Sequence, residues 1–388
     1  MPIRFLTAGE SHGPAVTAIL EGIPAGLELN VSRVDEELAR RQKGFGSGGR
    51  MKIETDKIRI LSGIMDGETM GMPISLLVEN FNHKQWKGKE TAPMTAPRPG
   101  HADLTGAVKY GYKDLRPSLE RASARETTMR VAVGAICKQF LAKFGIVVGG
   151  YVRSIGKVDA QLSGSKHEFW INAAEKNDLR CPDADAAEKM RTRIQQCIRE
   201  KDTMGGVIEI VALNVPVGLG SFAQWDTRLE AKLTQAILSV QAIKGVEIGD
   251  AFENARLPGT QAHDAVILDG EKLVRPTNRA GGIEGGISNG EPIIIRAAMK
   301  PIASTLTPQK TVDLVSGEAR ETTYERSDFC PVPRAVPVLE AVTAIVLADA
   351  LIAKLGGDSL AEMLPRFAAL KKANLSDIDL DNKPHIFW

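Results

Sequence analysis

The sequence predicts an α+β fold, with one compact domain over residues 1–360 and a C-terminal tail over residues 361–388. Three observations support this prediction. Short β-like runs recur between longer helical stretches. Hydrophobic residues make up 43% and charged residues 25% of the 388 residues, which is the balance of a globular protein with a large core. Finally, no flexible linker divides the chain.

The expected elements follow from local pattern. Strands are expected at residues 58–62, 74–78, 146–154, 206–215 and 292–299, and helices at 33–42, 118–144, 184–199, 226–239 and 338–355. In the second helix, apolar side chains recur at helical spacing at Met129, Val133, Ile136, Phe140 and Phe144. The glycine that follows, Gly145, is a natural helix stop.

The two halves of the chain share a faint pattern. Residues 23–27 read Ile-Pro-Ala-Gly-Leu before one charged helix, and residues 215–219 read Val-Pro-Val-Gly-Leu before another. Each half then closes an apolar helix with Ala-Lys-Phe-Gly or Ala-Lys-Leu-Gly. This pattern fits an internal pseudo-duplication around one core, and it fits chance repetition of common residues about equally well.

Composition disfavours several classes of protein. A net charge of +1 argues against general affinity for nucleic acid or membranes, and an aromatic content of 5% argues against RNA recognition by base stacking. No stretch approaches 18 apolar residues, and the N-terminus does not resemble a signal peptide. The four cysteines lack paired spacing, so we expect a protein of the reducing cytoplasm without a disulfide framework or zinc site.

Two short segments are the strongest candidates for chemistry. His12 lies within Gly-Glu-Ser-His-Gly at residues 9–13, and His101 lies within Arg-Pro-Gly-His-Ala-Asp at residues 98–103. Histidine exchanges protons near neutral pH, and a flanking glycine lets the backbone turn sharply beside a ligand. The other four histidines, at 83, 167, 263 and 385, lie in polar stretches and are expected on the surface. No ligand set for a metal stands out.

Many arginines lie in the same third of the chain, namely Arg40, Arg41, Arg50, Arg98, Arg121 and Arg125. Acid–base histidines beside many arginines indicate an anionic, phosphorylated substrate. If residues 121–125 are helical, Arg121 and Arg125 share one face with Ser123 between them. Surface ion pairs with Glu120 and Glu126 are the competing interpretation. The glycine-rich stretches at 44–50 and 281–290 are weak evidence by themselves, because each also suits a surface loop.

Taken together, these segments resemble the chorismate synthase family. The match runs in order through residues 7–14, 40–46, 49–52, 98–103, 119–127, 244–249, 285–290, 300–301 and 326–328, and covers the chain to about residue 360. Several motifs in a fixed order are far more specific than any one of them. The resemblance implies a β-α-β sandwich, a homotetramer, and the 1,4-anti elimination of phosphate from 5-enolpyruvylshikimate 3-phosphate to give chorismate with reduced FMN (FMNH2).

The resemblance also implies roles for individual residues. His12 would protonate the departing phosphate, His101 would lie near N1 of the flavin, Asp328 would relay a proton through flavin N5, and Ser11 would support that network. Flavin contacts would fall on Arg121, Ala122, Ser123, Gln241, Ala242, Gly285, Lys300, Pro301, Ile302, Ala303, Ser304 and Arg326. Substrate phosphate or carboxylate would be held by Arg41, Arg50, Arg125 and Arg334.

One position departs from the family pattern. Many members have arginine between the glycines of the 44–50 loop, where this chain has Ser47. Some members also have a pyridine-nucleotide contact at the position of Arg41, so NADPH is a candidate reductant, and Ser47 weakens that expectation. A separate flavin reductase is the alternative source of reduced FMN. The segment before Arg98 looks short, and Lys84 and Trp86 within it are candidates to close the site.

Three rival functions remain at this point. A flavin-dependent lyase acting on another phosphorylated ring acid would use the same arginines and histidines. A flavin- or phosphate-binding sensor without turnover would tolerate the loss of His12. An RNA-binding module is disfavoured by net charge and aromatic content.

Overall fold

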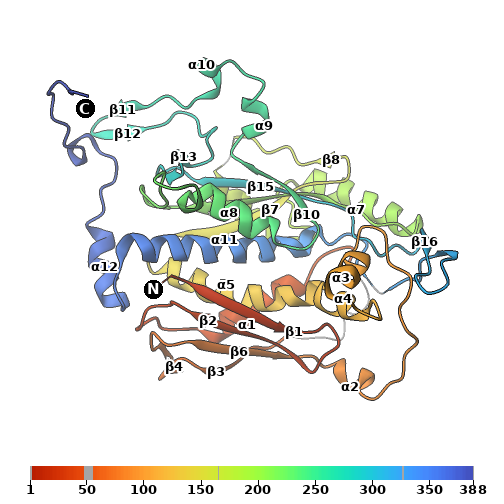
Figure 1. The fold of residues 1–388 in the computed structure, drawn as a ribbon. Helices are drawn as coiled ribbons and strands as arrows, with labels where there is room; N and C mark the ends of the chain where they lie inside the picture. The colour runs from red at the N-terminus through yellow and green to blue at the C-terminus, as the bar shows by residue number, and fades with distance from the viewer. Residues whose placement is uncertain (1, 48–55, 165, 326, 388) are drawn as a thin grey trace.

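The computed structural model describes residues 2–47, 56–164, 166–325 and 327–387. Two antiparallel sheets enclose a layer of helices (Figure 1). The first sheet has the order β1-β2-β6-β3, with β1 at Arg4–Gly9, β2 at Ala15–Glu21, β6 at Ile74–Glu79 and β3 at Arg59–Ser62. The second has the order β10-β15-β9-β7-β8, with bounds Ile243–Ile248, Ile293–Met299, Gly206–Leu213, Val147–Ile155 and Val158–Asp159. The predicted α+β sandwich is therefore confirmed.

The two halves have equivalent topology. The order β1-β2-β6-β3 in the first sheet corresponds to β7-β9-β15-β10 in the second. In each half a helix follows the second of these strands, α1 at Val31–Gln42 and α8 at Leu229–Leu238. A longer helix comes after the last of these strands in the chain, α5 at Thr127–Ala142 after β6 and α11 at Val332–Leu355 after β15. This correspondence supports pseudo-duplication over chance repetition.

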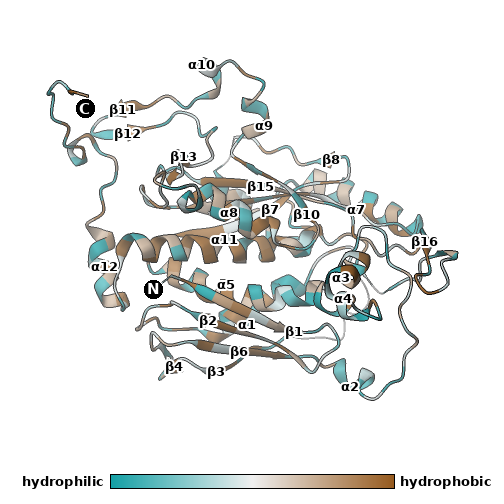
Figure 2. Ribbon diagram, viewed as in Figure 1, coloured by the Kyte–Doolittle hydropathy of each residue, from teal (hydrophilic) through white to brown (hydrophobic). Residues whose placement is uncertain are grey.

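The central layer is formed by α5 and α11, which pack against each other along their lengths. Hydrophobic residues make up much of both helices (Figure 2), and their buried side chains belong to the main core cluster. A Cβ on Gly134 of α5 would lie 2.3 Å from the Cβ of Ala341 of α11, so glycine permits the close crossing. By length and composition α11 passes as a membrane span, but 89% of its apolar window is buried inside the protein, as expected for a core helix.

Most predicted elements lie within a few residues of their expected bounds, and α7 spans Ala184–Arg199 as predicted. The single helix expected over 118–144 is wrong. Helix α4 ends at Arg121, a 3-10 turn covers Ala124–Glu126, and α5 begins at Thr127. The cause is Ser123, whose backbone is extended and whose hydroxyl accepts a hydrogen bond from the Arg125 backbone N–H. Of the strands in the two large sheets, β1, β2, β8 and β10 were not predicted.

The remaining elements lie at the edges of the sandwich. They are β4 at Ile64–Met65, β5 at Glu68–Thr69, α2 at His83–Trp86, α3 at Asp103–Tyr110, α4 at Arg116–Arg121, α6 at His167–Ala174, α9 at Ala251–Asn254, α10 at Gly259–Ala262, β11 at Ile267–Asp269, β12 at Lys272–Val274, β13 at Ile283–Glu284, β14 at Ile287–Ser288, β16 at Lys310–Val312, β17 at Ala319–Glu321 and α12 at Leu360–Ala368. The expected tail includes most of α12, whose Met363 is fully buried.

Candidate active site

Most of the predicted site residues that the structure describes gather at the same end of both halves. In the first half this end holds the β1–β2 turn, the end of β6 and the start of α5. In the second half it holds the end of β15, the start of α11 and the segment between α8 and β10. Helices α3 and α4 lie at this end of the molecule in Figure 1.

His12 lies in the β1–β2 turn and is held by Glu120 of α4. Its Nδ1–H donates to Oε1 of Glu120 at 2.6 Å, and its backbone N–H donates to Oε2 at 2.7 Å. The imidazole also contacts the indole of Trp86, with ring centroids 4.6 Å apart. Burial alone would raise the pKa of Glu120, but hydrogen bonds from His12 lower it below its usual range. Glu120 is thus an anion at neutral pH.

His101 has a comparable carboxylate partner. Its Nδ1–H donates to Oδ1 of Asp103 at 2.6 Å. Asp103 is fully buried and also accepts hydrogen bonds from the backbone N–H, Nε and one terminal nitrogen of Arg98. Burial would raise the pKa of Asp103, but the bonds from His101 and Arg98 hold it well below its usual range. The other terminal nitrogen of Arg98 donates to Oγ of Ser304 at 3.1 Å.

Arg41 and Arg125, both expected to hold substrate, converge on Asp56. Each guanidinium donates to a different oxygen of that carboxylate at 2.7 Å. All three side chains are buried, and Arg125 is also bonded to Oδ1 of Asn80. Burial lowers the pKa of Arg41 to about 10, with Asp56 opposing the shift and neighbouring arginines adding to it. Among the residues that the structure describes, Nε of Arg41 is a buried donor without a hydrogen-bond partner, which is a place where a ligand oxygen can bind.

Arg334 connects this cluster to Asp328. Its Nε donates to the backbone oxygen of Arg41 at 3.1 Å, and a terminal nitrogen forms a short ion pair with Asp328. Both side chains are mostly buried. Two predicted site residues, Arg50 and Arg326, lie outside the described residues.

Several expected flavin contacts are joined by hydrogen bonds. Arg121 donates to the backbone oxygen of Gly9 and to both oxygens of Thr7. Oγ1 of Thr7 donates to Glu126, which also accepts a bond from the amide of Gln241 at 3.3 Å. The other amide atom, Oε1 of Gln241, is buried without a partner.

Ser11 and Ser123 continue the network toward His12. The hydroxyl of Ser123 donates to that of Ser11 at 3.1 Å, and Ser11 is buried. Ala122 follows α4 directly as its C-cap. The predicted sharing of one helix face by Arg121 and Arg125 is wrong, because the chain breaks at Ser123 and sends the two guanidinium groups to different partners.

Residues 300–304 lie between Gln241 and the His101 segment. The backbone N–H of Lys300 donates to the oxygen of Ala242, a residue with a left-handed backbone at φ 67°. Nζ of Lys300 donates to the backbone oxygen of Gly100 at 3.2 Å. Burial and the nearby charge of Lys244 lower the pKa of Lys300. Two close lysines favour an anion at this position. Ile302 accepts a bond from Thr203, while Pro301 and Ala303 continue the segment.

One expected flavin contact lies elsewhere in the chain. Gly285 occupies the turn between β13 and β14, at φ 59°. Figure 1 shows β13 toward the opposite end of the upper layer from α3 and α4. The described contacts do not join it to the other predicted site residues.

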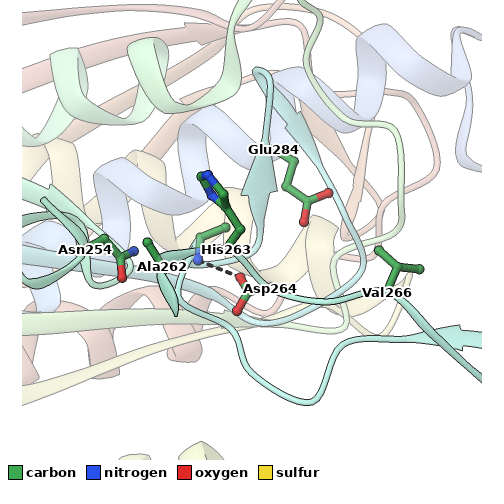
Figure 3. A pocket seen from close by; sticks show the side chains of 7 residues that line it. Asn254, Ala262, His263, Asp264, Val266 and Glu284 are labelled. Atoms are coloured by element: carbon green, nitrogen blue, oxygen red, sulfur yellow. Dashed lines mark hydrogen bonds between the residues drawn. The ribbon is translucent and has the colours of Figure 1, made fainter. Parts of the chain in front are cut away.

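A cavity of about 350 Å³ lies outside this site. Asn254, His263, Asp264 and Glu284 contribute to its lining (Figure 3). Its carboxylates already have structural partners, because Asp264 accepts bonds from the Ala280 and Arg279 N–H groups and Glu284 pairs with Arg275. Among the described residues, no group of three or more His, Cys, Asp or Glu side chains could hold a metal ion.

The other histidines depart in part from the surface prediction. His83 is half-buried and its Nδ1 lies 3.0 Å from the backbone oxygen of His12. His167 is half-buried and lies 3.4 Å from the hydroxyl of buried Tyr151. His263 and His385 are exposed as expected. Polar sequence context missed the first two because their partners come from distant segments.

Sequence reasoning did not single out Asp56 or Asn80, and gave Glu120 and Glu126 only as surface ion-pair partners. Local pattern carried no signal for Asp56 and Asn80. For Glu120 the only available signal was its place inside the 119–127 motif.

Comparison with known proteins shows the family to which the chain belongs. A family model described as chorismate synthase matches residues 3–352. A chorismate synthase of Chlorobaculum tepidum is 48% identical over 389 residues, covering 96% of this chain and 98% of its own. One from Aquifex aeolicus is 49% identical over 383 residues, covering 94% and 96%. A crystal structure of chorismate synthase matches with a TM-score of 0.78 and 43% identity over 95% of this chain and 97% of its own. The chain therefore belongs to the chorismate synthase family, the lyases that form chorismate and phosphate from 5-enolpyruvylshikimate 3-phosphate in aromatic amino acid biosynthesis.

Proposed function

We propose that the elimination takes place where the two halves meet, between His12, His101 and the Arg41–Arg125–Arg334 cluster. The observation that carries this proposal is the convergence of these residues from distant parts of the chain onto one end of the sandwich. The reaction breaks the C3–O bond to phosphate and a C–H bond at C6, so it needs anion binding, a proton donor and a proton acceptor.

The residues present fit the reduced FMN on which the family depends. When bound, reduced FMN supplies an electron transiently to the elimination. The buried Oε1 of Gln241, which has no partner, offers an acceptor to a ring N–H. Lys300 beside Lys244 offers positive charge to a phosphate. We assign the cofactor to these residues with Arg121, Ala122, Ser123, Ala242 and residues 301–304; Arg326 and Gly285 remain expectations of the family.

The substrate anions are assigned to the arginine cluster. Arg41, Arg125 and Arg334 bring three positive charges, and Asp56 and Asp328 bring two negative ones. The remaining positive charge and the partnerless Nε of Arg41 favour an anionic ligand. Arg50 is proposed to contribute a further contact.

The proton steps are assigned to three side chains. His12 donates a proton to the leaving phosphate, and Ser11 supports it through the hydroxyl chain to Ser123. Asp328 accepts the proton lost from C6, held in place by Arg334. His101, oriented by Asp103, balances the charge beside the cofactor.

The source of reduced FMN is a separate question. Arg41, the expected NADPH contact, is buried and paired with Asp56, which favours an external flavin reductase over direct use of NADPH. We also propose a cytoplasmic homotetramer, on the strength of the family resemblance.

An anaerobic assay tests the proposal. The protein is mixed with 5-enolpyruvylshikimate 3-phosphate and chemically reduced FMN, and chorismate and phosphate are followed. Parallel reactions contain oxidised FMN plus NADPH, or shikimate 3-phosphate in place of the substrate. We expect turnover only with the enolpyruvyl substrate and pre-reduced FMN. Turnover with NADPH would overturn the external-reductase proposal. A folded, flavin-bound protein without turnover would instead indicate a binding protein.

A further inference from the structure

We infer that Glu120 is a positioning residue that holds His12 with its proton on Nδ1, so that Nε2 is the nitrogen that exchanges a proton with the ligand. This inference rests on the proposed role of His12 as the proton donor. It adds a residue with a defined task to the site.

The carboxylate of Glu120 forms hydrogen bonds with both the backbone and the side chain of His12. One oxygen accepts the imidazole Nδ1–H at 2.6 Å and the other accepts the His12 backbone N–H at 2.7 Å. The backbone oxygen of Glu120 also accepts the N–H of Ser11 at 3.2 Å. Three bonds to two consecutive residues restrict both the turn and rotation of the ring.

The charge of Glu120 decides which imidazole nitrogen carries the proton. A carboxylate only accepts hydrogen bonds, and the pKa of Glu120 lies below its usual range, so the nitrogen facing it must be protonated. Nδ1 is therefore occupied, and a proton given to phosphate leaves from Nε2. The carboxylate also stabilises the positive imidazolium that precedes the transfer.

His101 provides an internal comparison. Its partner Asp103 shares its charge with Arg98 through three hydrogen bonds. Among the residues that the structure describes, no lysine or arginine side chain is hydrogen bonded to Glu120. Glu120 therefore directs its charge mainly at His12, while Arg98 already neutralises Asp103. Removing the carboxylate of Glu120 should therefore alter the protonation of His12 more than removing that of Asp103 alters the protonation of His101.

The surroundings of His12 are defined on its other sides. The Trp86 indole covers the ring at 4.6 Å, and Lys89 lies 5.0 Å from the centre of that indole. His83 meets the His12 backbone oxygen, and Arg116 lies close enough to influence Glu120. Because the chain has four tryptophans and Trp170 contacts His167, the part of the pH-dependent fluorescence that is lost in His12→Gln is taken as the Trp86 signal that reports on His12.

The test compares Glu120→Gln, Glu120→Asp and the control Glu10→Gln. Glu10 lies two positions before His12 and its side chain is described without a hydrogen bond or ion pair, so its variant removes a nearby charge without touching the ring. The tautomer is read from ¹⁵N shifts of labelled imidazole, assigned by their loss in His12→Gln. Tryptophan fluorescence against pH and kcat against pH are measured in parallel.

For Glu120→Gln we expect a mixture of tautomers and a kcat lower by about 10- to 1000-fold, with KM changed less than about threefold. The alkaline limb of the profile of kcat against pH should also move to lower pH, because the imidazolium has lost its anionic partner. Glu120→Asp should restore the pH profile and part of the rate. Glu10→Gln should match the wild type in all three readouts.

Two results would overturn the inference. One is a Glu120→Gln protein that keeps the Nδ1–H tautomer and the wild-type pH profile, even with a lower rate. The other applies if Glu120→Gln does not fold. It is a folded Glu120→Asp protein whose pH profile is no more displaced than that of Glu10→Gln but whose kcat is as low as that of His12→Gln. The ¹⁵N measurement on the wild type needs no turnover, so failure of the chorismate assay would reject the proposed function and leave this readout decisive.

Discussion

The two halves of the molecule share a strand order but supply different chemistry to the site. The first half brings His12, His101 and the buried pair Arg41 and Arg125, all held by carboxylates. The second half brings the amide of Gln241 and the close pair Lys244 and Lys300. It also brings the backbone of residues 241–242 and 300–304, and Asp328. By our assignment, one topology therefore supplies both histidines and most of the substrate arginines from the first half, and Asp328, Arg334 and most of the cofactor contacts from the second.

The connection between the first two strands explains much of this difference. In the first half residues 10–14 join β1 to β2 directly, which places His12 at the sheet edge. In the second half residues 156–205 make the corresponding connection and include β8, α6 and α7. The long connection adds helices at this place, whereas the short one leaves His12 open to side chains from other segments, such as Glu120 and Trp86. The comparison can be tested by changing each half separately.

The largest effects are expected at the histidines of the first half. His12→Ala and His101→Ala should each lower kcat by about 10- to 10,000-fold, because the first removes the proposed proton donor and the second the proposed charge balance beside the cofactor. Flavin affinity, measured by fluorescence quenching, should change much less. A parallel loss of folding and activity in both variants would argue against a catalytic role and against this division between halves.

Asp328→Asn tests the residue of the second half that we propose as the proton acceptor. We expect kcat to fall by about 100-fold while flavin stays bound. The asparagine amide has the shape of the carboxylate it replaces but cannot accept a proton. Stopped-flow measurement of chorismate formation at saturating flavin separates chemistry from binding. Wild-type turnover would remove Asp328 from the mechanism.

Asp56→Asn tests the ion cluster of the first half. It leaves Arg41 and Arg125 without their shared carboxylate, so we expect a loss of about 3 kcal/mol in the free energy of unfolding at pH 7. Burial raises the pKa of Asp56, but the two arginines hold it below the unfolded value of about 4. The stabilisation is full above that value and is lost as the pH falls through the folded pKa.

Urea denaturation at several pH values and one protein concentration measures this difference. The gap between wild type and Asp56→Asn should close in acid. A gap of constant size from pH 7 to pH 3 would show that charge pairing is not its cause.

The smallest effect is expected where α5 of the first half packs against α11 of the second half. Gly134→Ala would place a Cβ 2.3 Å from that of Ala341, so α5 and α11 must separate. We expect a loss of about 1–3 kcal/mol in stability. Gly259→Ala is the matched control, since its new Cβ meets only His263, at 3.7 Å. Equal midpoints of thermal unfolding for both variants would contradict tight packing between α5 and α11.

Local pattern in the sequence determined the motifs and most of the long helices, but only about half of the strands in the two large sheets. The apolar spacing in residues 129–144 produced α5, and the repeated Pro-x-Gly-Leu segments marked the start of equivalent helices in the two halves. The motifs around His12 and His101 were readable because glycine and histidine side by side have few purely structural uses. These features depend on neighbours within a few residues, so a single sequence contains them.

Only the tertiary structure decided which charges meet. Asp56 reaches Arg125, 69 residues away, and Glu120 reaches His12, 108 residues away, and neither pairing has a local signature. The break at Ser123 was also invisible, because helix propensity favours Ala122–Arg125 while capping and these distant ion pairs favour the turn. Buried charges must find partners wherever the fold brings them, and that placement depends on how the two sheets close over α5 and α11.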